Sequence, residues 1–245
     1  MYKQIARAST LLALVSVAAL AQQPDTRPTV AVLPFVNSAI GASNAELAPL
    51  SKGIADLLIA EMGQNAGIRL VERENLQKLL DEQNLARDGR ADEATAARIG
   101  KLLGAKHIVT GSFITDRSGR MVLTLKSIDS ETGIIEWNTR QEGKTEEFLD
   151  LVSKTAAAAN TGLKLPAITM APAARQTSEA RTEERKKVPF QAVMMYSRAI
   201  SAQDAGKKDE AIQLFSQTIQ RFPTFDDAKK ACERLNGSPC AATGG

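Results

Sequence analysis

The spacing of hydrophobic and polar positions changes several times between residues 28 and 163. Residues 29–36 form a β-branched and apolar run, typical of a strand buried on both faces, with Pro34 limiting pairing near its end. Apolar residues then recur at helical spacing from Leu47 to Met62. A short strand over residues 68–71 and a helix over residues 72–84 follow. The first half of this region is therefore predicted to alternate strands and helices.

The second half of the region predicts one more helix, three strands and a closing helix. Asp92 is placed to cap a helix that Gly104 ends. The strands over residues 107–114, 121–128 and 134–140 are separated by short polar turns, as in a β-meander. Residues 146–163 have helical spacing. The order βαβααβββα predicts an α/β fold, a three-layer domain over residues 28–163 with a mixed β-sheet.

The remaining chain divides into a linker, a helical segment and a tail. Residues 164–188 contain prolines, small polar residues and a charged stretch, which predicts a polar linker. In residues 189–236, Gly206, Ala211, Phe215 and Pro223 have the spacing of one tetratricopeptide (TPR) unit, although Met195 replaces the usual large aromatic residue. This predicts a small all-α TPR-like hairpin, followed by a flexible tail over residues 237–245.

A single TPR-like hairpin does not bury its apolar face by itself. We therefore expect this face to dock on the α/β domain, on a second copy of the chain or on a partner protein. The candidate protein-binding residues of the hairpin are its large apolar side chains: Phe190, Met194, Tyr196, Phe215 and Phe222.

The first 21 residues have the three parts of an export signal. Lys3 and Arg7 precede an apolar segment over residues 11–20, and Ala19 and Ala21 offer small residues at a cleavage site before Gln22. We expect a cleaved signal peptide over residues 1–21 and a periplasmic mature protein. No later segment reaches eighteen apolar residues, so no transmembrane segment is expected in the mature chain.

Charge and composition argue against nucleic acid as a partner. The chain has 31 basic and 28 acidic side chains, and removal of Lys3 and Arg7 leaves 29 against 28. A near-neutral protein has no electrostatic footprint for nucleic acid. Aromatic residues make up only 4% of the chain, which argues against a base-stacking platform.

Few residues are candidates for chemistry. His107, the only histidine, begins an apparent buried strand, and without a nucleophile motif we interpret it as a strand residue near the sheet edge and not as a general base. The sequence has no phosphate-binding glycine loop and no nucleophile elbow. We predict no catalytic residue, no metal site and no cofactor, so the chain is not expected to be an enzyme.

Two further pairs of residues leave alternatives open. Glu72 and Arg73 either cap the start of a helix or form a charged site, and acidic groups at a helix N-terminus favour the cap. Cys232 and Cys240 are the only cysteines, and in an oxidising compartment they form either a disulfide or two free thiols.

Several stretches, in order, resemble the CsgG family of curli production assembly and transport components. Residues 30–35 resemble its opening strand, residues 50–58 its first helix, residues 71–83 its second strand and helix, and residues 96–112 its last matched region. The resemblance implies a structural role for Glu72 and Arg73, in which Arg73 braces the strand–helix corner through carbonyls or a carboxylate. It also implies self-association, so a homo-oligomer is one expectation.

The resemblance implies an exported, non-enzymatic scaffold or adaptor in the bacterial cell envelope. Its partners are then expected to be envelope proteins, in curli-type secretion or in envelope assembly. The alternative is a subunit of a CsgG-type outer-membrane secretion channel. That channel inserts two long amphipathic hairpins per subunit, whereas the turns after Ile114 and Ile128 are short here. A hydrolase is disfavoured because no nucleophile–base pair is evident.

Overall fold

The computed structural model describes residues 25–39, 42–83, 91–167 and 183–240. The predicted signal peptide, most of the predicted linker and the last five residues of the tail lie outside these ranges. The α/β part begins with β1 (Thr29–Val32), β2 (Val36–Asn37), α1 (Ala42–Leu47), α2 (Leu50–Met62), β3 (Arg69–Leu70) and α3 (Arg73–Gln83). It continues with α4 (Glu93–Leu103), β4 (His107–Thr115), β5 (Arg120–Asp129), β6 (Ile135–Lys144), the 3-10 turn η1 (Thr145–Glu147) and α5 (Phe148–Gly162).

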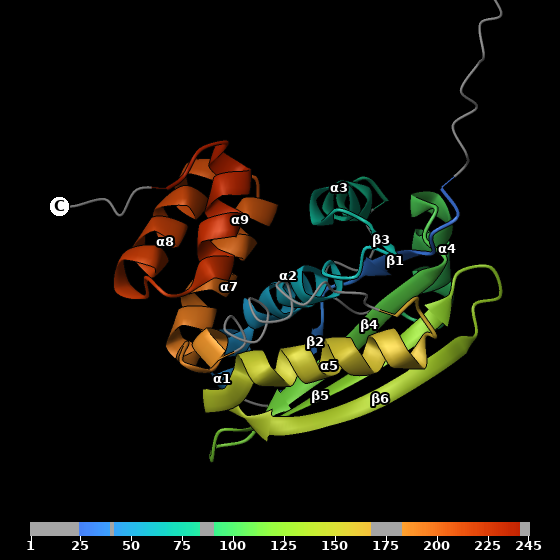
Figure 1. The fold of residues 1–245 in the computed structure, drawn as a ribbon, viewed down its shortest axis with the longest axis horizontal. Coiled ribbons are helices and arrows are strands. Elements are labelled where there is room, and N and C mark those ends of the chain that lie inside the picture. Colours follow the sequence, from blue (N-terminus) through green and yellow to red (C-terminus); the bar gives the residue numbers. More distant parts are fainter. Residues whose placement is uncertain (1–24, 40–41, 84–90, 168–182, 241–245) are drawn as a thin grey trace, which may run out of the picture.

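The strands form one mixed sheet in the order β3-β1-β4-β5-β6, with β2 also paired to β4 (Figure 1). The β1 strand is parallel to β3 and β4, whereas β4, β5 and β6 are antiparallel. This confirms the predicted α/β fold with a mixed sheet. The predicted first strand is divided at Leu33–Phe35 into β1 and β2, because Pro34 has no N–H for the ladder. Neither β2 nor α1 was predicted as a separate element.

Side chains of β1 and of Leu33, the residue after it, point alternately into two hydrophobic cores. Val30 and Val32 join the core under α2 and α5, and Ala31 and Leu33 join the core under α3 and α4. The strand is therefore buried on both faces, as its β-branched sequence predicts. His107 begins β4, which lies between β1 and β5. The prediction of a strand residue is confirmed, but its placement near the sheet edge is wrong, because β3 and β6 are the strands at the two edges.

The C-terminal helices are α7 (Phe190–Asp204), α8 (Lys208–Arg221) and α9 (Asp226–Asn236), of which α7 packs against α2, α8 against α7 and α9 against α8 (Figure 1). Their apolar residues belong to the same core as α2 and α5. Of the three surfaces expected for the hairpin's apolar face, the α/β domain is the one that it covers. Gly206 lies between α7 and α8 with a φ of +72°, a conformation that favours glycine.

The described ends of the predicted linker pack against the folded body. Leu165 and Val188 are buried. Arg185 is also buried, and its Nη1 ion-pairs with Glu61 of α2 at 3.1 Å and with Asp227 of α9 at 2.5 Å. The charged stretch near residue 185 therefore helps to join α9 to α2. No helix among the described residues is long and apolar enough to cross a membrane.

Candidate interaction surface

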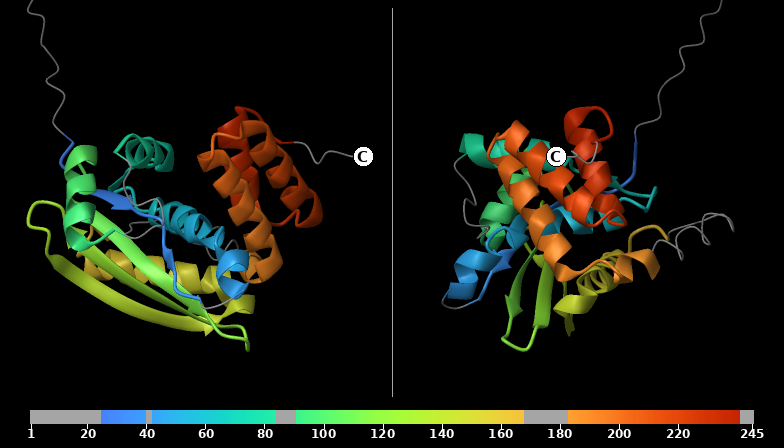
Figure 2. Two further views of the ribbon diagram at one scale, coloured as in Figure 1. Left: turned by 180° about the vertical axis from the view of Figure 1, so that it is seen from behind. Right: turned by 90° about the vertical axis from the view of Figure 1, so that its left-hand side faces the viewer.

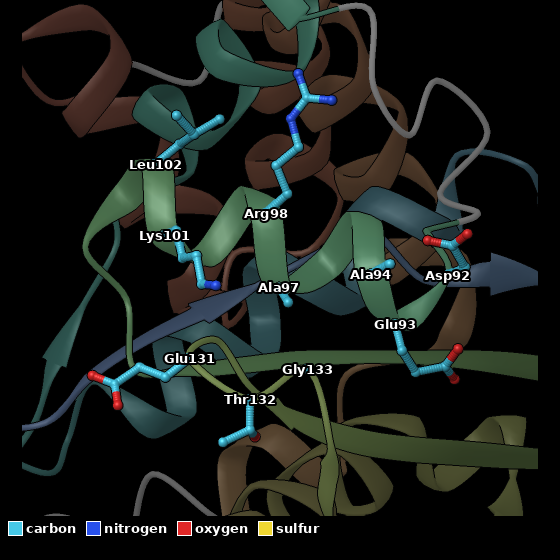
Figure 3. Close-up of a pocket in the computed structure, with 10 residues that line it drawn as sticks. All are labelled: Asp92, Glu93, Ala94, Ala97, Arg98, Lys101, Leu102, Glu131, Thr132 and Gly133. Carbon is cyan, nitrogen blue, oxygen red and sulfur yellow. The ribbon is translucent and has the colours of Figure 1, made fainter.

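A hollow of about 770 Å³ lies between α4 and the turn that joins β5 to β6 (Figure 3). Helix α4 is fixed at both ends, because the Asp92 side chain accepts a hydrogen bond from the Thr95 backbone N–H at 2.7 Å and Gly104 ends the helix at a φ of +62°. These two caps confirm the sequence prediction for this helix. The residues that line the hollow are Asp92, Glu93, Ala94, Ala97, Arg98, Lys101, Leu102, Glu131, Thr132 and Gly133.

The β5–β6 turn on the other side of the hollow is held by one carboxylate. Asp129 Oδ1 accepts hydrogen bonds from the backbone N–H groups of Glu131 at 3.0 Å and Thr132 at 2.8 Å, and from Thr132 Oγ1 at 3.0 Å. The hydrogen bonds from Thr132 are the main cause of a lowered pKa of the Asp129 carboxyl. Gly133 continues the turn at a φ of +72°. The turn is therefore well ordered by its own hydrogen bonds.

Large apolar side chains are exposed in this region: Leu102 lines the hollow, and Ile134 and Ile135 follow Gly133, which also lines it. Leu102 of α4 is 53% exposed, and Ile134 and Ile135, directly after Gly133, are 65% and 41% exposed. We call Leu102, Ile134 and Ile135 the apolar rim. Among the described residues, the only other large apolar side chain with comparable exposure is Ile114, on another part of the sheet. Grouped apolar exposure of this kind marks interaction surfaces.

Some of the charged groups around the hollow are already engaged with protein atoms. Arg98 Nη2 donates to Gln83 Oε1 at 3.0 Å, and Glu93 ion-pairs with Lys126 of β5. In Figure 3, Arg98 points away from Thr132 and Gly133, whereas Ala97 lies on the side of α4 that faces them. Among the described residues, no group of three His, Cys, Asp or Glu side chains is placed to hold a metal ion. This arrangement favours binding through apolar contact.

His107 lies outside the hollow, in contact with Glu136. The His107 Nδ1 atom is 2.5 Å from Glu136 Oε1, and the Ser127 hydroxyl donates to the same oxygen at 2.8 Å. The serine hydroxyl therefore bonds the carboxylate and not the imidazole, which is not the arrangement of a nucleophile and its base. His107 instead joins β4 to β6 across β5.

Arg73 lies at the corner between β3 and α3, as predicted, but its partners come from three helices. It is 8% exposed and forms ion pairs with Asp56 of α2 at 3.0 Å, with Asp204 of α7, and with Glu74 at 3.3 Å. Its ion-pair partners are carboxylates, which is one of the two kinds of partner that the resemblance implied. Glu72 is exposed, and its backbone carbonyl accepts from the N–H groups of α3. The sequence did not predict Asp56 and Asp204, although Asp56 stands out as a carboxylate in an apolar helix.

The candidate binding residues of the hairpin largely face the protein's own core. Tyr196 and Phe215 are fully buried, with ring centroids 5.7 Å apart, so they are removed from any partner-binding surface. Phe190, Met194 and Phe222 are partly buried against the same core. The physical reason is that the apolar face of the hairpin docks on α2, which leaves no large aromatic group for a partner.

Cys232 and Cys240 form a disulfide with a Cα–Cα distance of 6.0 Å. Cys232 is buried on α9, and Cys240 lies beyond the end of that helix. The bridge therefore ties the start of the tail to the helical hairpin, and it selects the disulfide over the two free thiols.

The family model of the curli production assembly/transport component CsgG matches residues 10–119. This match confirms the resemblance that the sequence motifs indicated, over the part of the chain that contains β1 to β4. The sequence matches none of the curated proteins with which it was compared.

Several solved structures share part of the fold at low identity. The C-terminal domain of LpoB from Escherichia coli is 19% identical over 48% of this chain and 83% of that chain, with a TM-score of 0.37. Lipoprotein GNA1162 from Neisseria meningitidis is 9% identical over 54% of this chain and 96% of that chain, with a TM-score of 0.39. The PelC dodecamer from Paraburkholderia phytofirmans is 11% identical over 58% of this chain and 91% of that chain, with a TM-score of 0.33. At TM-scores below 0.5, these likenesses define neither function nor assembly for this chain.

Proposed function

We propose that the protein is an exported, non-enzymatic scaffold or adaptor of the CsgG type, which binds other proteins in the bacterial cell envelope. The observation that carries this proposal is the exposed apolar rim beside the hollow, on a capped helix and a hydrogen-bonded turn. The signal-like pattern of residues 1–21 supports a periplasmic location. The family match supports a role in curli-type secretion or envelope assembly.

The apolar rim is suited to supply binding energy. Complete burial of a leucine or isoleucine side chain contributes about 1.5–3 kcal/mol, so Leu102 and Ile134 together form the centre of a contact. Charged residues around the hollow, such as Lys101 and Glu131, then fix the orientation of the partner at the rim of the contact.

Site-specific photo-cross-linking in the producing bacterium tests this function. A photoreactive amino acid is placed at Leu102 or at Ile134. As a control, it is placed at Lys208 on α8, in the C-terminal helical hairpin. We expect discrete adducts with an envelope protein from the two rim positions and none from Lys208. Adducts of twice the chain's own mass would show self-association through this surface.

A polar substitution in the same surface provides the matched control. The change Ile134→Ser removes apolar area at a residue that is 65% exposed, so it leaves the fold intact. We expect it to reduce the adduct formed from Leu102 several-fold. If adducts formed equally from Lys208, or if none formed from the rim, the proposed binding function would be rejected.

A further inference from the structure

Helix α4 covers one end of one face of the β4–β5–β6 part of the sheet, and the rest of this face lies on the side of the strands opposite α5 (Figure 2). In the left view of Figure 2, β5 and β6 lie in front of α5. Helix α4 lies near the end of these strands where the β5–β6 turn is. The register aligns the outward side chains in rows across the strands, which we call the open sheet face: Ile114, Val122 and Glu142; Ser112, Thr124 and Arg140; Lys126 and Asn138; Arg120 and Lys144.

The alternation of buried and exposed residues along β5 shows that this face is the solvent-facing side of the strand. Met121, Leu123 and Leu125 are completely buried under α2 and α5, whereas the intervening Thr124 is exposed and Val122 is half-buried. Successive side chains of a strand point to opposite faces. The open sheet face is therefore the solvated side of a strand pattern with one buried side.

The open sheet face is basic, although the α/β region is acidic as a whole. It holds Arg120, Lys126, Arg140 and Lys144, and the carboxylates that reach it are Glu142 and, from α4, Glu93. Four basic groups against two acidic groups give a charge of +2. Residues 28–163 contain 15 basic and 18 acidic side chains, a charge of −3. In the adjoining β4–β5 turn, Asp116 and Arg117 cancel one another, and the Glu146 carboxylate lies near Gly119, so that the face and this turn together carry a charge of +1.

One exposed apolar side chain lies on the same face, on β4, with β5 between it and the basic residues of β6. Ile114 is 44% exposed and lies opposite Val122 in the register. The Arg120 and Arg140 side chains are 59% and 62% exposed, and both contact Glu142, Arg140 at 2.6 Å. Their guanidinium groups are thus oriented on the face while most of their surface stays open to a ligand.

We propose that the open sheet face docks an acidic polypeptide segment of a partner protein. Carboxylates of that segment pair with Arg120, Arg140 and Lys144, and an apolar residue covers Ile114. Ser112, Thr124 and Asn138, between the charges, offer hydrogen-bonding groups that suit a polypeptide better than a lipid surface. This surface is separate from the apolar rim and extends the proposed function, since it gives the scaffold a second contact of defined chemistry.

Binding of fluorescently labelled poly-L-glutamate, measured by fluorescence anisotropy, tests the proposal. The double variant Arg140→Gln with Lys144→Gln removes two exposed charges from the face. We expect it to bind roughly tenfold more weakly than the unmodified protein, as expected for the loss of two exposed ion pairs. Binding should weaken further as salt is added. Amide resonances of Ser112 and Thr124 should shift on titration of the unmodified protein.

Lys207→Gln with Lys208→Gln provides the matched control, because it removes the same charge from the N-terminal end of α8 and the residue before it. An equal loss of affinity in the control would show diffuse attraction and overturn the proposal. Binding to vesicles of phosphatidylglycerol without binding to poly-L-glutamate would overturn it in favour of a lipid surface. A variant Leu102→Ser should retain poly-L-glutamate binding. This result distinguishes a failure of the binding function proposed for the apolar rim from a failure of the acidic-segment binding proposed for the open sheet face.

Discussion

At the scale of single residues, a cluster of buried charges joins the C-terminal helices to the α/β domain. Arg73 lies between Asp56 and Asp204, Lys52 Nζ is 3.1 Å from Asp204, and the Tyr196 hydroxyl donates to Asp56. Burial is the main cause of a lowered pKa of Lys52. Two cations and two carboxylates balance in this cluster, so the loss of one member leaves a charge buried without its counter-charge.

Replacement of Arg73 by methionine is expected to destabilise the protein strongly. The change Arg73→Met leaves Asp56 and Asp204 buried without their shared cation, and removal of one partner of a buried ion pair costs about 3–5 kcal/mol. The free energy of unfolding in urea measures this. Glu74→Gln, at the half-exposed partner of Arg73, should change it by less than about 1 kcal/mol. Similar values for both variants would contradict the prediction.

Tyr196 should make stability sensitive to alkaline pH. Burial, and next the charge of Asp56, raise the pKa of Tyr196 well above its ordinary value of 10.0. Above about pH 10 the unfolded chain loses this proton while the folded chain keeps it, so stability is complete below that pH and falls as pH rises. The free energy of unfolding in urea should fall less between neutral and alkaline pH for Tyr196→Phe than for the unmodified protein. An identical alkaline loss in both proteins would assign it to other groups.

At the scale of elements, α2 and α7 cross at a contact that only glycine permits. A Cβ atom at Gly53 would lie 1.9 Å from Ser197 Oγ and 2.7 Å from its Cβ. Ser197 is completely buried, and its hydroxyl bonds the Val193 carbonyl at 2.7 Å, so it has no room to move. The close approach of these helices therefore depends on residue 53.

Replacement of Gly53 by valine should separate the two helices. We expect Gly53→Val to lower the free energy of unfolding by about 2 kcal/mol, in the range measured for overpacked cores. Combining it with Ser197→Gly should restore part of this loss, which a double-mutant cycle measures directly. Absence of any coupling between the two positions would place the helices farther apart than the structure does.

Reduction of the Cys232–Cys240 disulfide should loosen the end of the hairpin. The bridge closes a loop with a sequence separation of 8 residues, for which the chain-entropy model gives about 2–3 kcal/mol. The expected result is a lower thermal midpoint in the presence of a reductant. The double variant Cys232→Ser with Cys240→Ser should be insensitive to the reductant. If the reductant lowered both midpoints equally, the loss would not come from the bridge.

Local pattern predicted most elements, because their causes lie within a few residues. The Asp92 cap, the Gly104 stop and the β-branched run of β1 each act locally. The hydrophobic pattern did not show which of the adjacent residues Leu102 and Leu103 on α4 is exposed. The structure leaves Leu102 exposed and Leu103 half-buried, because the orientation of the helix on the sheet decides between them.

At the scale of the whole molecule, the charge cluster was not predictable, because its members come from distant parts of the chain. Tyr196 and Asp56 are 140 residues apart. Nothing in either local sequence specifies that α7 docks on α2. For the same reason, the sequence placed Tyr196 and Phe215 among the candidate binding residues, although both complete a core shared by the two parts of the chain.

A shared core predicts that the α/β domain and the helical hairpin unfold together. Residues of α7, α8 and α9 lie in the same hydrophobic core as α2 and α5, and Arg73 and Arg185 join the two parts by buried ion pairs. Trp137, the only tryptophan, lies on β6 beside α5 and reports on the α/β domain, whereas far-ultraviolet circular dichroism reports on all helices. We expect the two signals to give coincident urea transitions.

Removal of residues 189–245 should therefore damage more than the hairpin. The truncation removes the contact of α2 with α7 at Gly53 and leaves Asp56 without Tyr196. We expect the truncated chain to lose its cooperative transition or to shift far toward lower urea concentration, and the isolated segment 189–245 to show no cooperative melt as a monomer. Two separated transitions in the full chain, or a truncated chain as stable as the whole, would mean that the hairpin and the α/β domain are energetically independent. In that case the apolar face of the hairpin would be free to serve a partner after all.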